Sequence, residues 1–196
     1  MAITPNRRAR QLNSPAARPL RLASEANIGS RFTAALAAAD GVAGAHCIHE
    51  MWMRGAFAAH IEAAQEKLWA QCAATIPEWL PTRYVSWLPV AYEVCAGVVS
   101  GTSGRCNIYL VLLDNASRRG DAHGVYVGMS QYSAAQRFDQ HKAGIRAAGC
   151  VLKRGLEVLT GPVLHLQHIR RSEAQRIEAE LALALADAGV AVEGGH

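Results

Sequence analysis

The chain has no long hydrophobic run, and this absence bounds the class of protein. Its 196 residues are 51% hydrophobic and 18% charged, yet no stretch approaches the roughly 18 consecutive apolar residues that a membrane-spanning helix needs. Charged residues interrupt the alanine-rich segments, namely Asp40, Arg54, Glu62 and Glu93. We therefore expect a soluble protein with no membrane association, long enough for one compact domain and an appendage.

Regular cysteine spacing is also missing. The five cysteines form no CxxC pair, and the N-terminus lacks the apolar core of a secretory signal. Reduced thiols in the cytoplasm are the expectation. Import into an organelle stays open, because the N-terminus is rich in arginine.

Acidic residues are absent from residues 1–24, which carry five arginines. Residues 25–106 carry five Lys or Arg against seven Asp or Glu, and residues 107–196 carry ten against nine, so the net charge of +4 belongs to the tail. Three interpretations stay open: an arm that neutralises nucleic-acid phosphates, an organelle transit peptide, or a solvated end. We expect residues 1–26 to form a basic, disordered tail.

Helix-forming residues dominate residues 27–104, which we expect to form a mainly helical domain. Apolar residues recur near helical spacing over residues 51–76, and Pro77 stops the pattern. Residues 84–99 fit either a helix or a strand. The segment 100–104 is typical of a linker and predicts a domain boundary there.

Residues 105–196 have a different pattern, in which strands precede and separate helices. Residues 107–113 and 125–128 have the length of strands, and residues 162–169 alternate like a third strand. Ser133-Ala-Ala-Gln136 and Ser172-Glu-Ala-Gln175 have the capping-box pattern of a helix start. This order of elements predicts an α+β domain.

One carboxylate of the last expected helix stands apart from its neighbours. At helical spacing Glu178 lies on the apolar face, whereas Glu173 and Glu180 lie on the opposite, solvated face. A carboxylate at the edge of an apolar stripe is costly unless it is paired or coordinates a cation. Glu178 is therefore the candidate metal ligand, and the alternative is a boundary residue whose carboxylate reaches water.

Four further side chains suit a phosphodiester. Arg137 and His141 are four residues apart and project from one helix face, where a planar cation and an imidazole fit a phosphate. Tyr109 and Tyr126 lie on expected neighbouring strands, where two buried phenols could face a common polar cleft. Each pair taken alone also fits a structural role, as a solvated helix face or as core tyrosines.

The order of these residues resembles the GIY-YIG nuclease family. Asn-Ile-Tyr at 107–109 and Tyr-Val-Gly at 126–128 match the two motifs, and Arg137, His141 and an Ile-Glu-x-x-Leu helix with Glu178 follow. The resemblance covers about residues 106–196. It implies a three-stranded antiparallel sheet flanked by helices, which cuts nucleic-acid phosphodiesters with one divalent metal.

The resemblance also implies a role for each residue. Tyr109 matches the first motif tyrosine, near the attacking water, and Tyr126 matches the second. Arg137 matches the arginine that contacts the scissile phosphate, and His141 is similar to the histidine that many members place one turn later. Glu178 matches the glutamate that binds the metal, for which Mg²⁺ or Mn²⁺ is expected.

The chain departs from the family pattern at the first motif, in the length of the loop between the motifs, and after the glutamate helix. Asn107 stands where most members have glycine, at what we expect to be the exposed start of a strand. The asparagine that members commonly place after the glutamate helix is missing, and His196 stays outside the catalytic set because terminal residues often fray.

The sequence therefore predicts a metal-dependent DNA endonuclease of residues 105–196, acting in DNA repair or restriction. We expect DNA contacts from Arg118, Arg119 and Lys142. One alternative is a catalytically inactive nucleic-acid-binding protein that retains the fold. Another is a protein-interaction module, in which residues 27–104 bind a protein partner or dimerise.

Overall fold

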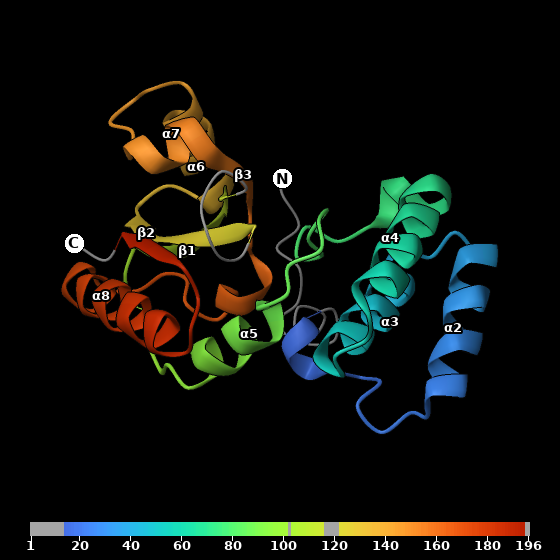
Figure 1. Ribbon diagram of the computed structural model, residues 1–196. Coiled ribbons are helices and arrows are strands. Elements are labelled where there is room, and N and C mark those ends of the chain that lie inside the picture. The colour runs from blue at the N-terminus through green and yellow to red at the C-terminus, as the bar shows by residue number, and fades with distance from the viewer. Residues whose placement is uncertain (1–13, 102, 116–121, 195–196) are drawn as a thin grey trace, which may run out of the picture. The chain divides into compact units, whose positions relative to one another are not determined.

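A computed structural model describes residues 14–101, 103–115 and 122–194 of the chain. The chain divides into two compact units, Met1–Ser86 and Trp87–His196 (Figure 1). The division differs from the boundary expected near Gly104, because helix α5 (Leu88–Ala96) packs against α8 (Arg171–Asp187) and the short helix η3 (Gly161–Val163) of the second unit. Among the described residues, no helix has the length and apolar character needed to span a membrane.

The first unit is helical, as its composition predicts. A short helix η1 (Pro15–Ala17) precedes α2 (Glu25–Ala37), α3 (Gly41–Met53), α4 (Ala58–Cys72) and η2 (Ala73–Thr75). Ser24 and Asp40 cap α2 and α3, because each side chain accepts a hydrogen bond from a backbone N–H in the first turn. The helical pattern over residues 51–76 is interrupted at Gly55, whose φ of 72° ends α3 in the left-handed conformation that favours glycine.

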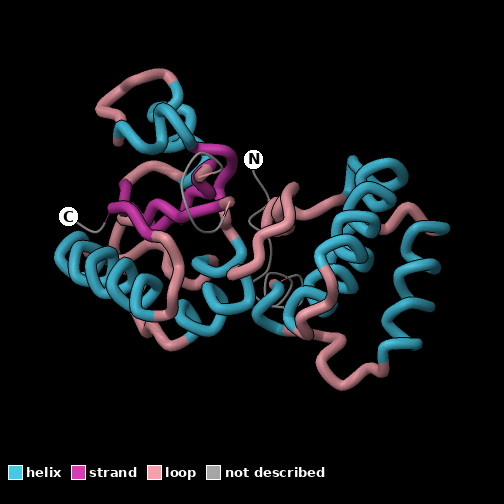
Figure 2. The backbone as a smooth tube through the Cα atoms, in the orientation of Figure 1, coloured by secondary structure: helices cyan, strands magenta, loops and turns pink. Residues whose placement is uncertain are grey.

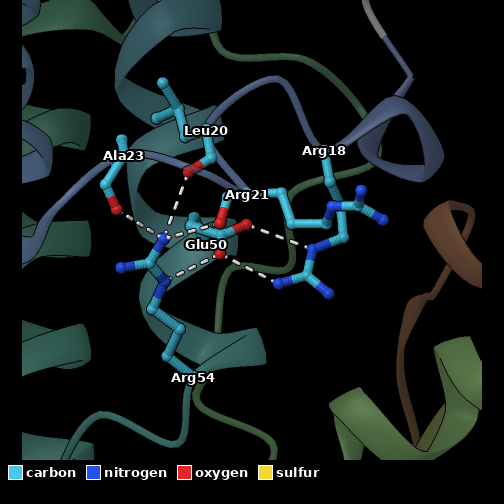
Figure 3. Close-up of polar contacts among 6 residues, drawn as sticks. All are labelled: Arg18, Leu20, Arg21, Ala23, Glu50 and Arg54. Carbon is cyan, nitrogen blue, oxygen red and sulfur yellow. Dashed lines mark hydrogen bonds and ion pairs between the residues drawn. The ribbon is translucent and has the colours of Figure 1, made fainter.

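A buried carboxylate fastens the segment before α2 to helix α3 (Figure 3). Glu50 is 1% exposed and accepts hydrogen bonds from Arg18 at 2.9 and 3.1 Å and from Arg54 at 2.8 Å. Burial alone would raise the pKa of Glu50, but the hydrogen bonds and charges of the two arginines lower it overall. The guanidinium of Arg54 also donates to three backbone carbonyls, those of Leu20, Arg21 and Ala23.

The second unit is built on a four-stranded mixed sheet, drawn in magenta in Figure 2. The strand order is β3 (Gly155–Val158), β1 (Asn107–Asp114), β2 (His123–Ser130) and β4 (Val192–Gly194). Strand β1 pairs antiparallel with β2 and β3, whereas β4 pairs parallel with β2. The unit is α+β as predicted, and both expected strands at 107–113 and 125–128 lie within β1 and β2.

The expected strand at residues 162–169 is wrong. Gly161–Val163 is instead the short helix η3, and only Ile169 forms a β-bridge, with Cys106. Pro162 is the second residue of η3, in its first turn, where its fixed φ is favourable and its missing N–H costs nothing. The third antiparallel strand is β3, which lies earlier in the chain.

The helices of the second unit lie on both faces of the sheet (Figure 1). Helices α6 (Ala134–Lys142) and α7 (Gly149–Arg154) cover the face that carries Tyr109, Val111 and Leu113. Ser133 caps α6 in a full capping box with Gln136, as predicted. The capping box expected at Ser172 is wrong, because α8 begins at Arg171 and has no side-chain cap.

Candidate functional site

Tyr109 and Tyr126 lie on the same face of the sheet. In the antiparallel register, Tyr109 is opposite Gly128 and Tyr126 is opposite Val111, so the two phenols are diagonal neighbours. Their ring centroids are 6.0 Å apart and the rings are tilted by 45°. A Cβ at Gly128 would come within 2.6 Å of the Tyr109 hydroxyl and 2.7 Å of the Tyr126 ring. The glycine therefore provides the space that both rings occupy.

His141 reaches these tyrosines from α6. Its side chain is 1% exposed, and its Nε2 atom lies 2.9 Å from the Tyr109 hydroxyl oxygen. Its Nδ1 atom accepts a hydrogen bond of 2.9 Å from the backbone N–H of Ala148, so Nδ1 carries no proton. Burial and the charge of Arg137 lower the pKa of His141 to about 4. The ring is therefore neutral at pH 7, and Nε2 donates its hydrogen to Tyr109.

Tyr126 is the second phenol of the site and lies beside Tyr109. Tyr109 receives the hydrogen of His141, so its own hydroxyl hydrogen points away from that ring. The neighbouring Tyr109 partly opposes the effect of burial on the pKa of Tyr126. Burial raises the pKa of both phenols, and that of Tyr109 most strongly. Tyr109 is 1% exposed whereas Tyr126 is half-buried. Of the two phenols, Tyr126 is the one that reaches solvent.

Arg137 is the cation of this site. Its guanidinium donates to the carbonyl oxygens of Ile145 and Arg146, at 3.2 and 2.7 Å, and to the side chain of Gln140 at 3.1 Å. Its charge partly opposes the rise in the pKa of Tyr109 that burial causes. Since a guanidinium has five N–H donors in one plane, these partners fix its orientation and leave donor capacity for an anion.

Glu178 lies on α8 at the edge of the buried stripe, as its helical spacing predicts. It is half-buried, while three residues of the stripe are 0% exposed, namely Ala174, Leu181 and Leu185. The Glu178 carboxylate contributes to the raised pKa of Tyr126, after burial as the larger cause. The carboxylate is therefore within electrostatic range of the solvent-reaching phenol.

Glu178 is the carboxylate of this site that could hold a metal ion. Across residues 14–101, 103–115 and 122–194, no group of three or more His, Cys, Asp or Glu side chains is arranged to hold a metal ion. Mg²⁺ is commonly held by one or two carboxylates and several waters, and the half-buried Glu178 fits that pattern.

The remaining residues that the sequence singles out make other contacts or lie outside the described residues. The ammonium of Lys142 donates to the carbonyl oxygens of Leu152 and Gly155, at 3.3 and 3.1 Å, so it holds the end of α7. Asn107 is buried, which contradicts the expected exposed strand start. Its amide donates to the carbonyl of Tyr132 at 3.0 Å and accepts from the N–H of His168 at 3.1 Å. Arg118, Arg119 and His196 lie outside the described residues.

The sequence interpretation missed the contribution of β4. Glu193 is opposite Tyr126 in the parallel register and forms an ion pair with Arg154 of α7. Gly194 has a φ of 99°, and a Cβ there would lie 3.1 Å from the ring of Tyr126. The β-branched residues Val190 and Val192 were the only signal for this strand, and three residues are too few for a periodicity to be read.

No family model matches this chain, and no curated protein or solved structure matches it. The chemistry of the site therefore follows from its own groups. Two neighbouring phenols, a neutral imidazole, an oriented guanidinium and a carboxylate within electrostatic range are group types suited to the charge and protons of a phosphodiester.

Proposed function

We propose that the second unit is a metal-dependent DNA endonuclease of the GIY-YIG type. The observation that carries the proposal is the 2.9 Å hydrogen bond between Tyr109 and His141, made beside Tyr126 and Arg137. These four residues come from β1, β2 and α6, and the motif resemblance names each of them. A purely structural core has no need of an arginine, a histidine and two phenols in mutual contact.

Arg137 is suited to stabilise the negative charge that develops on the phosphate during attack. Its hydrogen bonds to the carbonyls of Ile145 and Arg146 hold the guanidinium in one orientation before substrate binds. A charge that needs no reorganisation during the reaction stabilises the transition state more than a mobile one does. This preorganisation is the proposed catalytic contribution of Arg137.

Tyr126 is the proposed group for proton transfer with the attacking water. Its half-buried hydroxyl reaches the surface, where it can both donate to and accept from a water. His141 is not the base, because its Nδ1 atom is occupied by the N–H of Ala148. His141 and the buried Tyr109 are positioning residues, whose rings contact the ring of Tyr126 and hold it in place.

Glu178 is the residue that would hold Mg²⁺ or Mn²⁺. When bound, the cation would supply positive charge beside the phosphate and offset the carboxylate charge that raises the pKa of Tyr126. Glu178 itself keeps that carboxylate at the border between the buried stripe of α8 and solvent.

The test is cleavage of supercoiled, linear and branched DNA by the full chain in Mg²⁺, Mn²⁺ or EDTA. We expect metal-dependent cutting that falls at least about 100-fold in Glu178→Gln. The matched control is Glu180→Gln on the same helix, where the carboxylate is exposed and pairs with Arg176. Equal cutting by Glu178→Gln and Glu180→Gln would refute the site, and so would undiminished cutting by Arg137→Ala.

A folded protein that binds DNA and cuts none of these substrates would refute the proposed hydrolysis. That result would favour the alternative of a nucleic-acid-binding protein without turnover. Absence of any nucleic-acid affinity at low salt would instead favour a protein-interaction module.

A further inference from the structure

Charge in the second unit is separated along the chain. Residues 131–155 carry five Lys or Arg and one Asp, whereas residues 156–196 carry three Lys or Arg and six Asp or Glu. The positive stretch forms α6, the turn of residues 143–148 and α7, which lie over the sheet face that holds Tyr109 (Figure 1). The unit is nearly neutral as a whole, but it has a basic cap, residues 134–154, on the side of the candidate site.

Two exposed cations of the basic cap take no part in holding it together. Lys142 is bound to backbone carbonyls and Arg154 to Glu193, so both hold the cap together. Arg146 and Lys153 are exposed, and neither side chain forms an ion pair within the described part of the chain. Their charges are therefore available to an anionic partner.

The turn that carries Arg146 is held in an unfavourable backbone conformation. Arg146 has a φ of 45°, in the left-handed region that residues with a Cβ seldom adopt. Arg137 stabilises this conformation through the carbonyls of Ile145 and Arg146, and the N–H of Ala148 is bonded to His141. Backbone strain of this kind persists where the surroundings enforce it, and it concentrates at functional segments.

The same turn exposes an apolar side chain. Ile145 is 56% exposed although it lies next to the strained Arg146. An exposed isoleucine between basic residues fits a partner that offers both anionic and apolar surface, as the backbone and base edges of DNA do.

We propose that the 143–148 turn and α7 are the surface on which the DNA backbone docks. Arg146 and Lys153 bind phosphates that flank the one held by Arg137, and Ile145 contacts a sugar or base edge. This inference rests on the proposed function for its choice of partner. Arg137 and His141 are hydrogen-bonded to the backbone of this turn. DNA that binds the turn therefore also contacts the segment that holds these two side chains.

The test measures binding of a fluorescent DNA duplex to the full chain by anisotropy, in EDTA, over a series of salt concentrations. Each lost phosphate contact lowers the slope of log affinity against log salt by about 1. We therefore expect Arg146→Asn and Lys153→Gln each to reduce the slope by about 1, and the double variant by about 2. Asparagine is chosen at position 146 because it tolerates the left-handed conformation.

The matched control is Arg176→Gln, which removes one exposed positive charge from α8. We expect it to leave the slope unchanged. Ile145→Ala should weaken binding several-fold without changing the slope, because an apolar contact releases no counterions. An unchanged slope in the double variant, a slope lowered equally by Arg176→Gln, or equal competition by polyglutamate would overturn the inference.

Because the binding test is run in EDTA, its result does not depend on the proposed metal-dependent cleavage. If the unmodified protein binds with the expected slopes and never cuts, the docking surface stands and the endonuclease proposal fails. If it cuts DNA and the double variant binds and cuts equally well, the docking surface fails and the endonuclease proposal stands. If it does not bind the duplex at any salt concentration, the docking surface is refuted.

Discussion

Substitution of Gly128 by alanine tests whether the two phenols must approach each other closely. The added Cβ would lie 2.6 Å from the Tyr109 hydroxyl and 2.7 Å from the Tyr126 ring, against about 3.6 Å for an ordinary contact. The rings must therefore separate from the strand by about 1 Å. A displacement of that size breaks the 2.9 Å bond from Tyr109 to His141.

We expect two separable effects of Gly128→Ala. Overpacking beside buried rings costs about 1 to 3 kcal/mol of unfolding free energy, and urea unfolding followed by circular dichroism measures it. Misplacement of Tyr126 lowers the rate of DNA cleavage by roughly 100-fold, measured at a temperature where the variant is fully folded.

Gly149→Ala is the matched control. Gly149 lies at the start of α7, and a Cβ there would have no heavy atom within 4 Å. Alanine at that position should leave stability and cleavage unchanged or slightly improved. If Gly128→Ala proves as stable and as active as Gly149→Ala, the close packing of the tyrosines is not what the site depends on.

Three further predictions concern stability. His49 is 3% exposed, and burial, followed by the charges of neighbouring groups, lowers its pKa to about 4. Because only the unfolded chain binds that proton between pH 6.5 and 4, His49 alone lowers the stability by about 3 kcal/mol over this range. His141, with the same lowered pKa, adds a loss in the same direction, so urea unfolding at several pH values should show a total fall at least this large. Glu50→Ala leaves Arg18 and Arg54 without their shared carboxylate and should lower the free energy of unfolding by about 3 kcal/mol. We expect a lower Tm, and an unchanged Tm would show that this ion-pair cluster does not stabilise the protein. Ser133→Ala removes the cap of α6 and should cost about 1 kcal/mol in urea unfolding.

Local signals were sufficient where a feature is contained in a few neighbouring residues. The capping box at Ser133 involves only four positions, so the sequence predicts it correctly. The same pattern at Ser172 fails, because the bridge between Ile169 and Cys106 ends the extended backbone two residues earlier and α8 begins there. The start of that helix depends on a partner strand that is distant in the sequence.

The candidate site shows the same difference between features set by neighbouring residues and features set by distant ones. The motif resemblance selected Tyr109, Tyr126 and His141, which lie together, but it could not reveal that His141 is neutral and faces Tyr109 through Nε2. That conclusion depends on the N–H of Ala148, a contact created by the turn after α6. The support of Tyr126 by β4 was equally hidden, since parallel pairing joins segments with no shared sequence pattern.

The position of β4 affects when the candidate site forms during folding. Contacts such as the capping box of α6 and the bond from Ala148 to His141 join near neighbours and can form early in folding. The pairing of β4 with β2 joins the ends of a long loop that includes α6, α7, β3 and α8, so its closure entropy is large. Tyr126 thus acquires its last packing partner late, and cleavage activity should recover in the slowest phase of refolding, after helix content has returned.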